Sequence, residues 1–72
     1  MPFVNVLITR DGVTREQKAQ VIAEITETLQ RVLNKRPEQT HIVIDEVDTD
    51  NWGHAGETQT VIRARARGES KT

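Results

Sequence analysis

The chain contains no cysteine, and this absence constrains what its 72 residues can fold into. A domain of this size buries only about 60% of the surface that its unfolded chain exposes, so it needs a further source of stability. Small proteins obtain it from disulfides, a structural metal or self-association. Disulfides are impossible here, and the two histidines, His41 and His54, are too few for an ordinary structural zinc site. We therefore expect one domain that is stabilised as a homo-oligomer and holds no metal.

The charge of the chain is small and unevenly distributed. Ten Lys and Arg residues against eleven Asp and Glu residues give a net charge of −1, unlike the basic surface of a nucleic-acid-binding protein. Residues 63–72 carry four of the basic residues and one of the acidic ones. No apolar run has the length of a membrane span, and no basic-then-apolar leader follows Met1. These features predict a cytoplasmic protein that binds neither nucleic acid nor membranes.

The amino-terminal segment has the composition of a β-strand. Residues 3–9 read Phe-Val-Asn-Val-Leu-Ile-Thr, which is rich in β-branched side chains and too short for a helix. Apolar side chains fall on both faces of this strand, as is usual for a strand covered on both sides. Arg10, Asp11 and Gly12 then predict a turn.

A helix is predicted to follow the turn. The Thr14 hydroxyl and Gln17, three residues later, form the pattern of a capping box. Asn34 is expected to end the helix in a left-handed conformation, and Pro37 prevents its continuation. Apolar residues recur with helical spacing along one face, at Val21, Ile22, Ile25, Leu29, Val32 and Leu33. We expect the opposite face to hold Lys18, Glu24, Glu27 and Arg31.

A second strand is predicted over residues 40–47, Thr-His-Ile-Val-Ile-Asp-Glu-Val. A strand, a helix and a strand at this spacing form a βαβ unit with parallel strands and a right-handed crossover. The helix covers one face of such a sheet. We expect another copy of the chain to cover the other face.

The remaining residues predict a turn and a short strand. Residues 52–56, Trp-Gly-His-Ala-Gly, suggest a tight turn or small hairpin. From Thr60 onward, Ile and Ala alternate with Arg63, Arg65 and Arg67, which predicts a short strand with one basic face. Residues 68–72 are expected to form a disordered tail. The predicted fold class is α/β (α+β), a single βαβ unit with a carboxyl-terminal hairpin or short strand, forming one domain over residues 1–67.

Several short segments, in this order, resemble the 4-oxalocrotonate tautomerase family. They are the Met-Pro start followed directly by a strand, the helix opening Glu16-Gln17-Lys18, the strand ending Ile44-Asp45-Glu46-Val47, and residues 51–57, Asn-Trp-Gly-His-Ala-Gly-Glu. The resemblance covers residues 2 to about 57. It implies a tautomerase-like fold completed by oligomerisation, with a hexamer expected first and a dimer or trimer still open. It also implies isomerisation of enols to ketones without a cofactor, with the amino-terminal proline as the catalytic base.

The proposed base, Pro2, suits this chemistry for independent reasons. Moving a proton between the oxygen and carbon of an enol needs a base whose pKa is near the working pH. An α-amino group has a pKa of about 7.7–8.0, and an apolar pocket lowers it further because burial disfavours the ammonium form. Pro2 has such an amine only when Met1 is removed, since its nitrogen is otherwise a planar amide.

The candidate substrate-binding residues depart from the family pattern at two positions. The family's arginine in the first loop aligns with Val13, so Arg10 or Arg15 would have to reach the same space, unless both are solvated loop charges. His41 falls where the family has a second arginine, and it is either a hydrogen-bond donor to a carboxylate or carbonyl or a partly exposed strand residue. Trp52 replaces a phenylalanine, as an aromatic wall of the pocket or a subunit contact. These departures favour a small-molecule substrate with one carboxylate.

Three functions are compatible with the sequence. The first is a tautomerase acting on a 2-hydroxydienoate or an aryl enolpyruvate, with Pro2 as general base. The second is a hydratase or dehalogenase of unsaturated acids, in which Pro2 is a general acid and Glu46, Asp45 or His41 prepares water. The third is a non-catalytic oligomeric binding module. The arginines of residues 63–67 either supply the missing cations to a neighbouring subunit or form a solvated edge.

Overall fold

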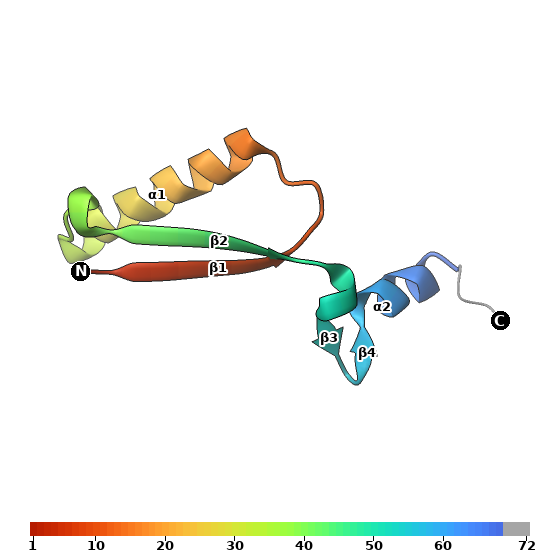
Figure 1. Ribbon diagram of the computed structural model, residues 1–72. Helices are drawn as coiled ribbons and strands as arrows, with labels where there is room; N and C mark the ends of the chain where they lie inside the picture. The colour runs from red at the N-terminus through yellow and green to blue at the C-terminus, as the bar shows by residue number, and fades with distance from the viewer. Residues whose placement is uncertain (69–72) are drawn as a thin grey trace.

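Two parallel strands lie at the centre of the structure, a computed structural model in which residues 1–68 are described. Strand β1 (Phe3–Thr9) pairs in parallel with β2 (His41–Val47) along the full length of both. Helix α1 (Arg15–Leu33) connects them and runs back across one face of the pair (Figure 1). The predicted βαβ unit is therefore confirmed, with the second strand beginning one residue later than expected.

The two faces of the sheet differ in what covers them. On the face toward α1, β1 presents Val4, Val6 and Ile8, and all three side chains are partly buried. On the outer face, Phe3 and Leu7 of β1 and Val43 of β2 are 66%, 54% and 42% exposed. A strand pair that is apolar on both faces and covered on one leaves its outer face ready for another layer.

Both predicted ends of α1 are confirmed. The Thr14 hydroxyl accepts a hydrogen bond from the Gln17 amide at 3.1 Å, and the Gln17 side-chain oxygen accepts one from the Thr14 amide at 2.9 Å. This reciprocal pair satisfies two amide groups that have no partner within the helix. At the other end, Asn34 adopts a left-handed conformation with φ 58° and donates its amide to the Gln30 carbonyl at 3.0 Å.

Lys18 was expected on the solvent face of α1, and this prediction is wrong. Its ammonium lies 2.9 Å from the Glu46 carboxylate of β2, so its side chain reaches the sheet. Lys18 precedes Ile25 by seven residues, or two turns, which places both on the same side of the helix. The aliphatic stem of a lysine can cover apolar surface while its charge reaches a partner.

A small carboxyl-terminal unit follows the sheet. A turn of 3-10 helix, η2 (Thr49–Asn51), leads to an antiparallel hairpin of β3 (Gly53–His54) and β4 (Glu57–Thr58). The turn between these two strands uses residues with positive φ, Ala55 at 54° and Gly56 at 82°. The predicted hairpin around the two glycines is confirmed.

The strand predicted from Thr60 onward is wrong, because residues 59–66 form a helix. Helix α2 (Gln59–Ala66) begins after Thr58, whose hydroxyl accepts a hydrogen bond from the Val61 amide at 3.2 Å. Gln, Arg and Ala are strong helix formers, and this propensity outweighs the alternating pattern. Gly68 ends this part of the chain in a turn, and the rest of the predicted tail lies outside the described residues.

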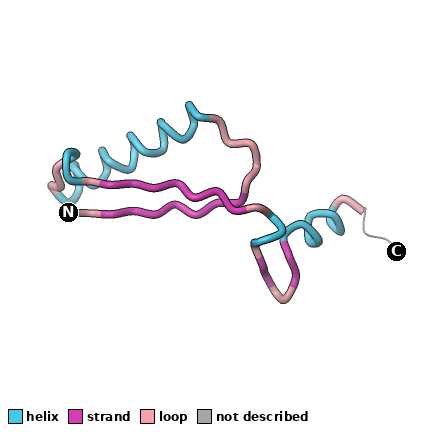
Figure 2. The backbone as a smooth tube through the Cα atoms, viewed as in Figure 1, coloured by secondary structure: helices cyan, strands magenta, loops and turns pink. Residues whose placement is uncertain are grey.

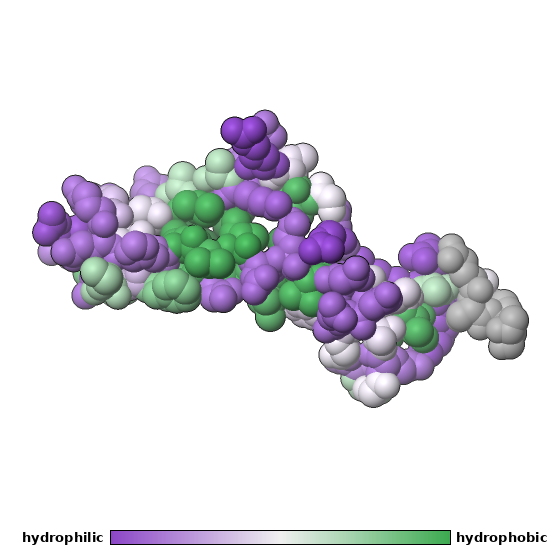
Figure 3. All heavy atoms as spheres, in the orientation of Figure 1, coloured by the Kyte–Doolittle hydropathy of each residue, from purple (hydrophilic) through white to green (hydrophobic). Residues whose placement is uncertain are grey.

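The molecule is elongated and has an incomplete core. Its radius of gyration is 16.6 Å, whereas a compact chain of this length would have about 11 Å. None of residues 1–68 is buried. Figure 2 shows the hairpin and α2 beyond the end of the strands instead of on the sheet. In Figure 3, hydrophobic residues gather between α1 and the strands, and no other part of the chain covers them in this view. A single chain therefore does not enclose its own apolar surface.

Replacing Thr14 with alanine should destabilise the fold by about 1 kcal/mol, because it removes the side-chain acceptor of the capping box. The measurement is urea unfolding at a fixed protein concentration, since oligomerisation makes stability concentration-dependent. The matched control is Thr28→Ala, in the middle of α1, where the hydroxyl only bonds back to the Glu24 carbonyl. Equal losses in the two variants would contradict a capping role for Thr14.

Candidate active site

Pro2 lies at the start of β1, at one end of the sheet. It is partly buried, and its carbonyl accepts a hydrogen bond from the His41 amide at 3.0 Å, which continues the strand pairing. Met1, in contrast, is 82% exposed. The Pro2 nitrogen is an amide while Met1 is attached and becomes a secondary amine when Met1 is cleaved. The backbone around Pro2 is thus held by β2, while Met1 is accessible.

A hollow of about 230 Å³ lies at the other end of the sheet. Its lining is mostly apolar and comes from β1, the end of β2 and the stretch from the end of η2 to the start of β3, namely Leu7, Val47, Asn51, Trp52 and Gly53. Trp52 is fixed by its backbone, because its carbonyl accepts the Gln59 amide at 2.7 Å and its amide donates to the Thr49 carbonyl at 3.4 Å. Asn51 adds a side-chain amide that can donate and accept hydrogen bonds.

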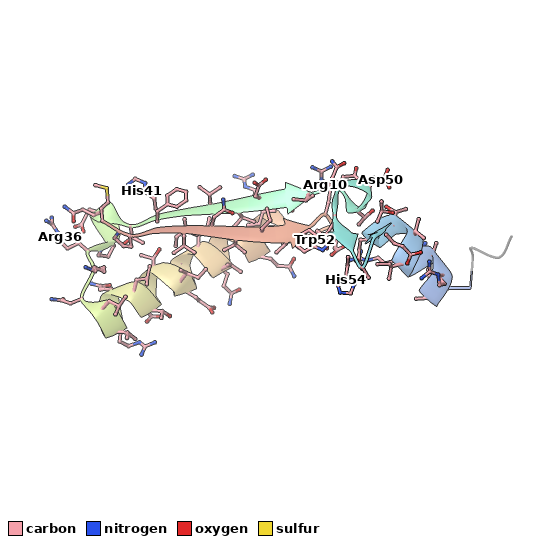
Figure 4. The ribbon with its side chains drawn as sticks, turned by 90° about the horizontal axis from the view of Figure 1, so that it is seen from below. Arg10, Arg36, His41, Asp50, Trp52 and His54 are labelled. Atoms are coloured by element: carbon pink, nitrogen blue, oxygen red, sulfur yellow. The ribbon has the colours of Figure 1, made fainter. Side chains whose placement is uncertain are left out.

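One chain does not bring Pro2 and Trp52 together. Leu7 lines the hollow and follows Pro2 by five residues. At the usual rise per residue of a strand, the two residues are about 17 Å apart. Figure 4 shows His41 at one end of the sheet, with Arg10 and Trp52 at the opposite end. The candidate residues are therefore divided between the two ends, Pro2 and His41 at one and Trp52 at the other.

Arg10 and Arg15 both lie at the Trp52 end. The Arg10 side chain donates to the Glu46 carbonyl at 3.4 Å and lies 4.0 Å from the Asp48 carboxylate, while its backbone amide donates to the Val47 carbonyl at 2.8 Å. Its side chain is still 59% exposed, so several of its donors face solvent. Arg15 is the first residue of α1 and is exposed.

Asp45 and Glu46 point to opposite faces of β2, as their adjacent positions predict. Glu46 faces α1 and is engaged by Lys18. Asp45 lies opposite Leu7 in the strand register and is exposed on the outer face. Among residues 1–68, no three His, Asp or Glu side chains come together as metal ligands.

Arg63 of α2 makes a contact that the sequence did not predict. Its guanidinium binds both carboxylate oxygens of Asp11, at 2.5 and 3.3 Å, and the Thr9 hydroxyl at 3.1 Å. The hydrogen bonds from Arg63, and then from Thr9, lower the pKa of the Asp11 carboxyl. This contact ties α2 to the loop that follows β1. We call Arg63, Asp11 and Thr9 the α2 latch.

The arginines of α2 do not form one basic face, because α2 is a helix. Arg65, two residues after Arg63, turns away from the latch and pairs with the Glu57 carboxylate of β4. The hydrogen bond from Arg65 lowers the pKa of Glu57. The expectation of a row of free cations along an edge strand is therefore wrong for these two residues.

Comparison with known proteins decides the family. Residues 2–62 match the family model described as tautomerase enzyme. The chain belongs to the tautomerase family. A probable tautomerase of Dickeya dadantii is 56% identical over 66 residues, which cover 92% of this chain and 98% of that protein.

Solved tautomerase structures share the fold. DmpI from Helicobacter pylori is 37% identical, with a TM-score of 0.78 over 83% of this chain and 98% of that one. The 4-oxalocrotonate tautomerase isozymes of Methylibium petroleiphilum give a structure that is 34% identical, with a TM-score of 0.82 over 89% and 98%. A more distant homologue from Chloroflexus aurantiacus, described as a heterohexamer, is 18% identical with a TM-score of 0.74 over 83% and 95%.

These findings establish the class of the enzyme. The protein is an isomerase of the tautomerase family, and the resemblance to 4-oxalocrotonate tautomerase is confirmed. Within the described part of this tautomerase, neither helix is long and apolar enough to cross a membrane. The site residues named from the sequence remain predictions, now with a position for each.

Sequence analysis missed the α2 latch and the Asn51 side of the hollow. Both join segments that are distant in the sequence, such as Asp11 and Arg63. Had residues 59–66 been predicted as a helix, Arg63 and Arg65 would have been placed on opposite sides of it, about 200° apart. Two different partners would then have been expected for them. No sequence pattern names Asp11 as the partner of Arg63.

The α2 latch should open at acidic pH. Because Asp11 has a lower pKa in the folded protein than in the unfolded chain, its contribution is present above about pH 4 and is lost as the pH falls through the lowered folded value. We expect Arg63→Gln to reduce the helical NMR shifts of residues 59–66 at pH 7, and this difference from the parent should shrink as the pH falls and the Asp11 carboxylate is protonated. The control, Arg31→Gln, should not change these shifts. A difference between the parent and Arg63→Gln that stays the same through the acid titration of Asp11 would contradict this role for Asp11.

Proposed function

We propose that the protein is a cofactor-independent enol–keto tautomerase in which the Pro2 amine, released by removal of Met1, is the general base. Its substrate is a 2-hydroxydienoate or an aryl enolpyruvate. The observation that carries the proposal is the place of Pro2, partly buried at the start of β1 and within a family match that begins at residue 2. The exposure of Met1 supports its removal.

The reaction needs one group that first accepts and then donates a proton. The neutral Pro2 amine takes the proton of the enol hydroxyl, and the electrons of the O–H bond form the ketone carbonyl. The double bond shifts, and the resulting ammonium delivers the proton to the substrate carbon. The amine returns to its neutral form, so no cofactor is consumed. A base works best here when its pKa lies near the working pH.

We propose that a second copy of the chain completes the site. The exposed apolar outer face, the elongated shape and the absence of a buried residue in the described part all support self-association. Two copies in antiparallel orientation would bring the Pro2 end of one to the Trp52 end of the other. We expect a hexamer, in line with the assembly named for the Chloroflexus homologue, and a dimer or trimer remains open.

The contacts in such a shared site follow from the two ends of the sheet. His41 would come from the chain that supplies Pro2 and would donate a hydrogen bond to the substrate. Trp52 would come from the partner copy and exclude water, which keeps the amine neutral. Arg10 and Arg15 would lie on the partner's side as cations near the substrate carboxylate.

Hydration or dehalogenation of an unsaturated acid is a second candidate, because Asp45 is an exposed carboxylate without an ion-pair partner among residues 1–68. There Pro2 would be protonated and donate a proton, while Asp45 prepares water. Glu46 suits that role less, since Lys18 holds it. Nitrogen-15 NMR of Pro2 at pH 7 separates the two reactions, since a base is largely neutral and an acid is protonated. Retention of Met1 in the natural protein would instead favour a binding module.

Pro2→Ala should lower ketonisation of phenylenolpyruvate by about two orders of magnitude or more, equivalent to about 3 kcal/mol of lost transition-state stabilisation. The assay compares the methionine-processed parent and variant after intact mass confirms both amino termini. Alanine keeps an amine but lacks the rigid ring that directs the lone pair. Equal rates in the two proteins would mean that Pro2 has a structural role in this reaction.

Val43→Lys should disrupt assembly, because it places a charge at the centre of the apolar outer face. Sedimentation velocity should show smaller species than the parent. Gln30→Lys, which adds the same charge on an exposed position of α1, is the control and should assemble normally. An unchanged oligomer in Val43→Lys would show that the outer face is not the contact.

A further inference from the structure

The Pro2 end of the sheet has a cation that no motif in the sequence identified. Arg36 lies between α1 and β2, immediately before a turn of 3-10 helix, η1 (Pro37–Gln39). Figure 4 shows Arg36 and His41 at the same end of the molecule, far from Trp52. A cation here would lie on the chain that supplies Pro2, whereas Arg10 and Arg15 lie at the other end.

The backbone of Arg36 is held close to Pro2 by a series of hydrogen bonds. The Arg36 carbonyl accepts the Gln39 amide at 3.0 Å and the Thr40 hydroxyl at 2.8 Å. The next residue, His41, donates its amide to the Pro2 carbonyl at 3.0 Å. Because 3-10 helix rises only about 2 Å per residue, Arg36 stays within roughly 10 Å of the start of β2. An arginine side chain is long enough to bridge much of that distance.

The Arg36 side chain is also available for a ligand. It is exposed, and no carboxylate among residues 1–68 forms an ion pair with it, including Glu38 two residues later. In contrast, Arg10, Arg63 and Arg65 each have a carboxylate or carbonyl partner.

The guanidinium group suits a carboxylate ligand. It can donate two parallel hydrogen bonds to both oxygens, which the ammonium of the neighbouring Lys35 cannot do in a fixed geometry. We infer that Arg36 binds the substrate carboxylate beside Pro2 and thereby makes the enzyme specific for enol acids. This inference rests on the proposed function.

The test compares a substrate that has the carboxylate with one that lacks its charge. Ketonisation of phenylenolpyruvate and of its methyl ester is measured with the methionine-processed parent, Arg36→Ala, Arg36→Lys and Arg31→Ala. In Arg36→Ala, kcat/KM for the acid should fall about 10- to 100-fold, mainly through KM, as expected for loss of a charged hydrogen bond. The ester should change little, so the preference for the acid disappears. Arg36→Lys should recover part of it.

Arg31→Ala is the matched control. It removes the same charge from the last turn of α1, near the same end of the molecule, at an exposed position that lies about 200° around the helix from the partly buried Leu29. It should keep the preference for the acid. Equal losses for acid and ester in Arg36→Ala, or equal effects in Arg31→Ala, would overturn the inference, because they would indicate a structural or long-range effect.

A binding measurement separates this inference from the proposed reaction. NMR titration of the parent and Arg36→Ala with 3-phenylpropionate and with its amide needs no turnover. If the parent ketonises neither substrate but prefers the acid in binding, and Arg36→Ala loses that preference, the proposed function fails and the carboxylate site stands. If the parent ketonises phenylenolpyruvate and Arg36→Ala keeps its preference for the acid, the proposed function stands and the inference about Arg36 fails.

Discussion

The parallel pairing of β1 and β2, covered by a helix on one face only, is the constraint on which the rest of the structure depends. The pairing extends from Pro2, whose carbonyl accepts the His41 amide, to Arg10, whose amide donates to Val47. With α1 on one face, the outer face keeps Phe3, Leu7 and Val43 exposed. A chain without cysteine has no cross-link to compensate for this, which supports the proposal that further burial comes from another chain.

The same pairing separates the chemical groups of the protein. Parallel strands place Pro2, His41 and the nearby Arg36 at the end where both strands begin, and Trp52 and Arg10 at the end where both finish. The first end has the proposed base but lacks the aromatic wall of Trp52. The second end has that wall but lacks the proposed base. Assembly in antiparallel orientation would therefore supply stability and a complete site together. Such an assembly would explain how so short a chain can be an enzyme.

Much of the fold could be predicted from the sequence because its signals are local. The capping box of Thr14 and Gln17, the left-handed Asn34 and the hairpin at Gly56 each depend on a few neighbouring residues. Residues 59–66 were mispredicted because alternating Ile, Ala and Arg fit a strand, while the helical propensity of Ala and Arg decided the outcome. Contacts between distant segments, such as Lys18 with Glu46 and Arg63 with Asp11, could not be derived from one sequence. Pro2 was proposed as the base from its position in the sequence and stays a prediction, while its distance from Trp52 required the structure.

The central claim is that each site takes Pro2 from one chain and Trp52 from another, and mixing two variants tests it most directly. Pro2→Ala and Trp52→Ala chains, each impaired alone, are unfolded together in equal amounts and refolded. If the site is shared, random assembly gives about one site in four with both natural residues, so about a quarter of the parent activity should return. If each chain forms its own site, no mixed oligomer contains an intact one, and activity no higher than the mean of the two variants would contradict the account.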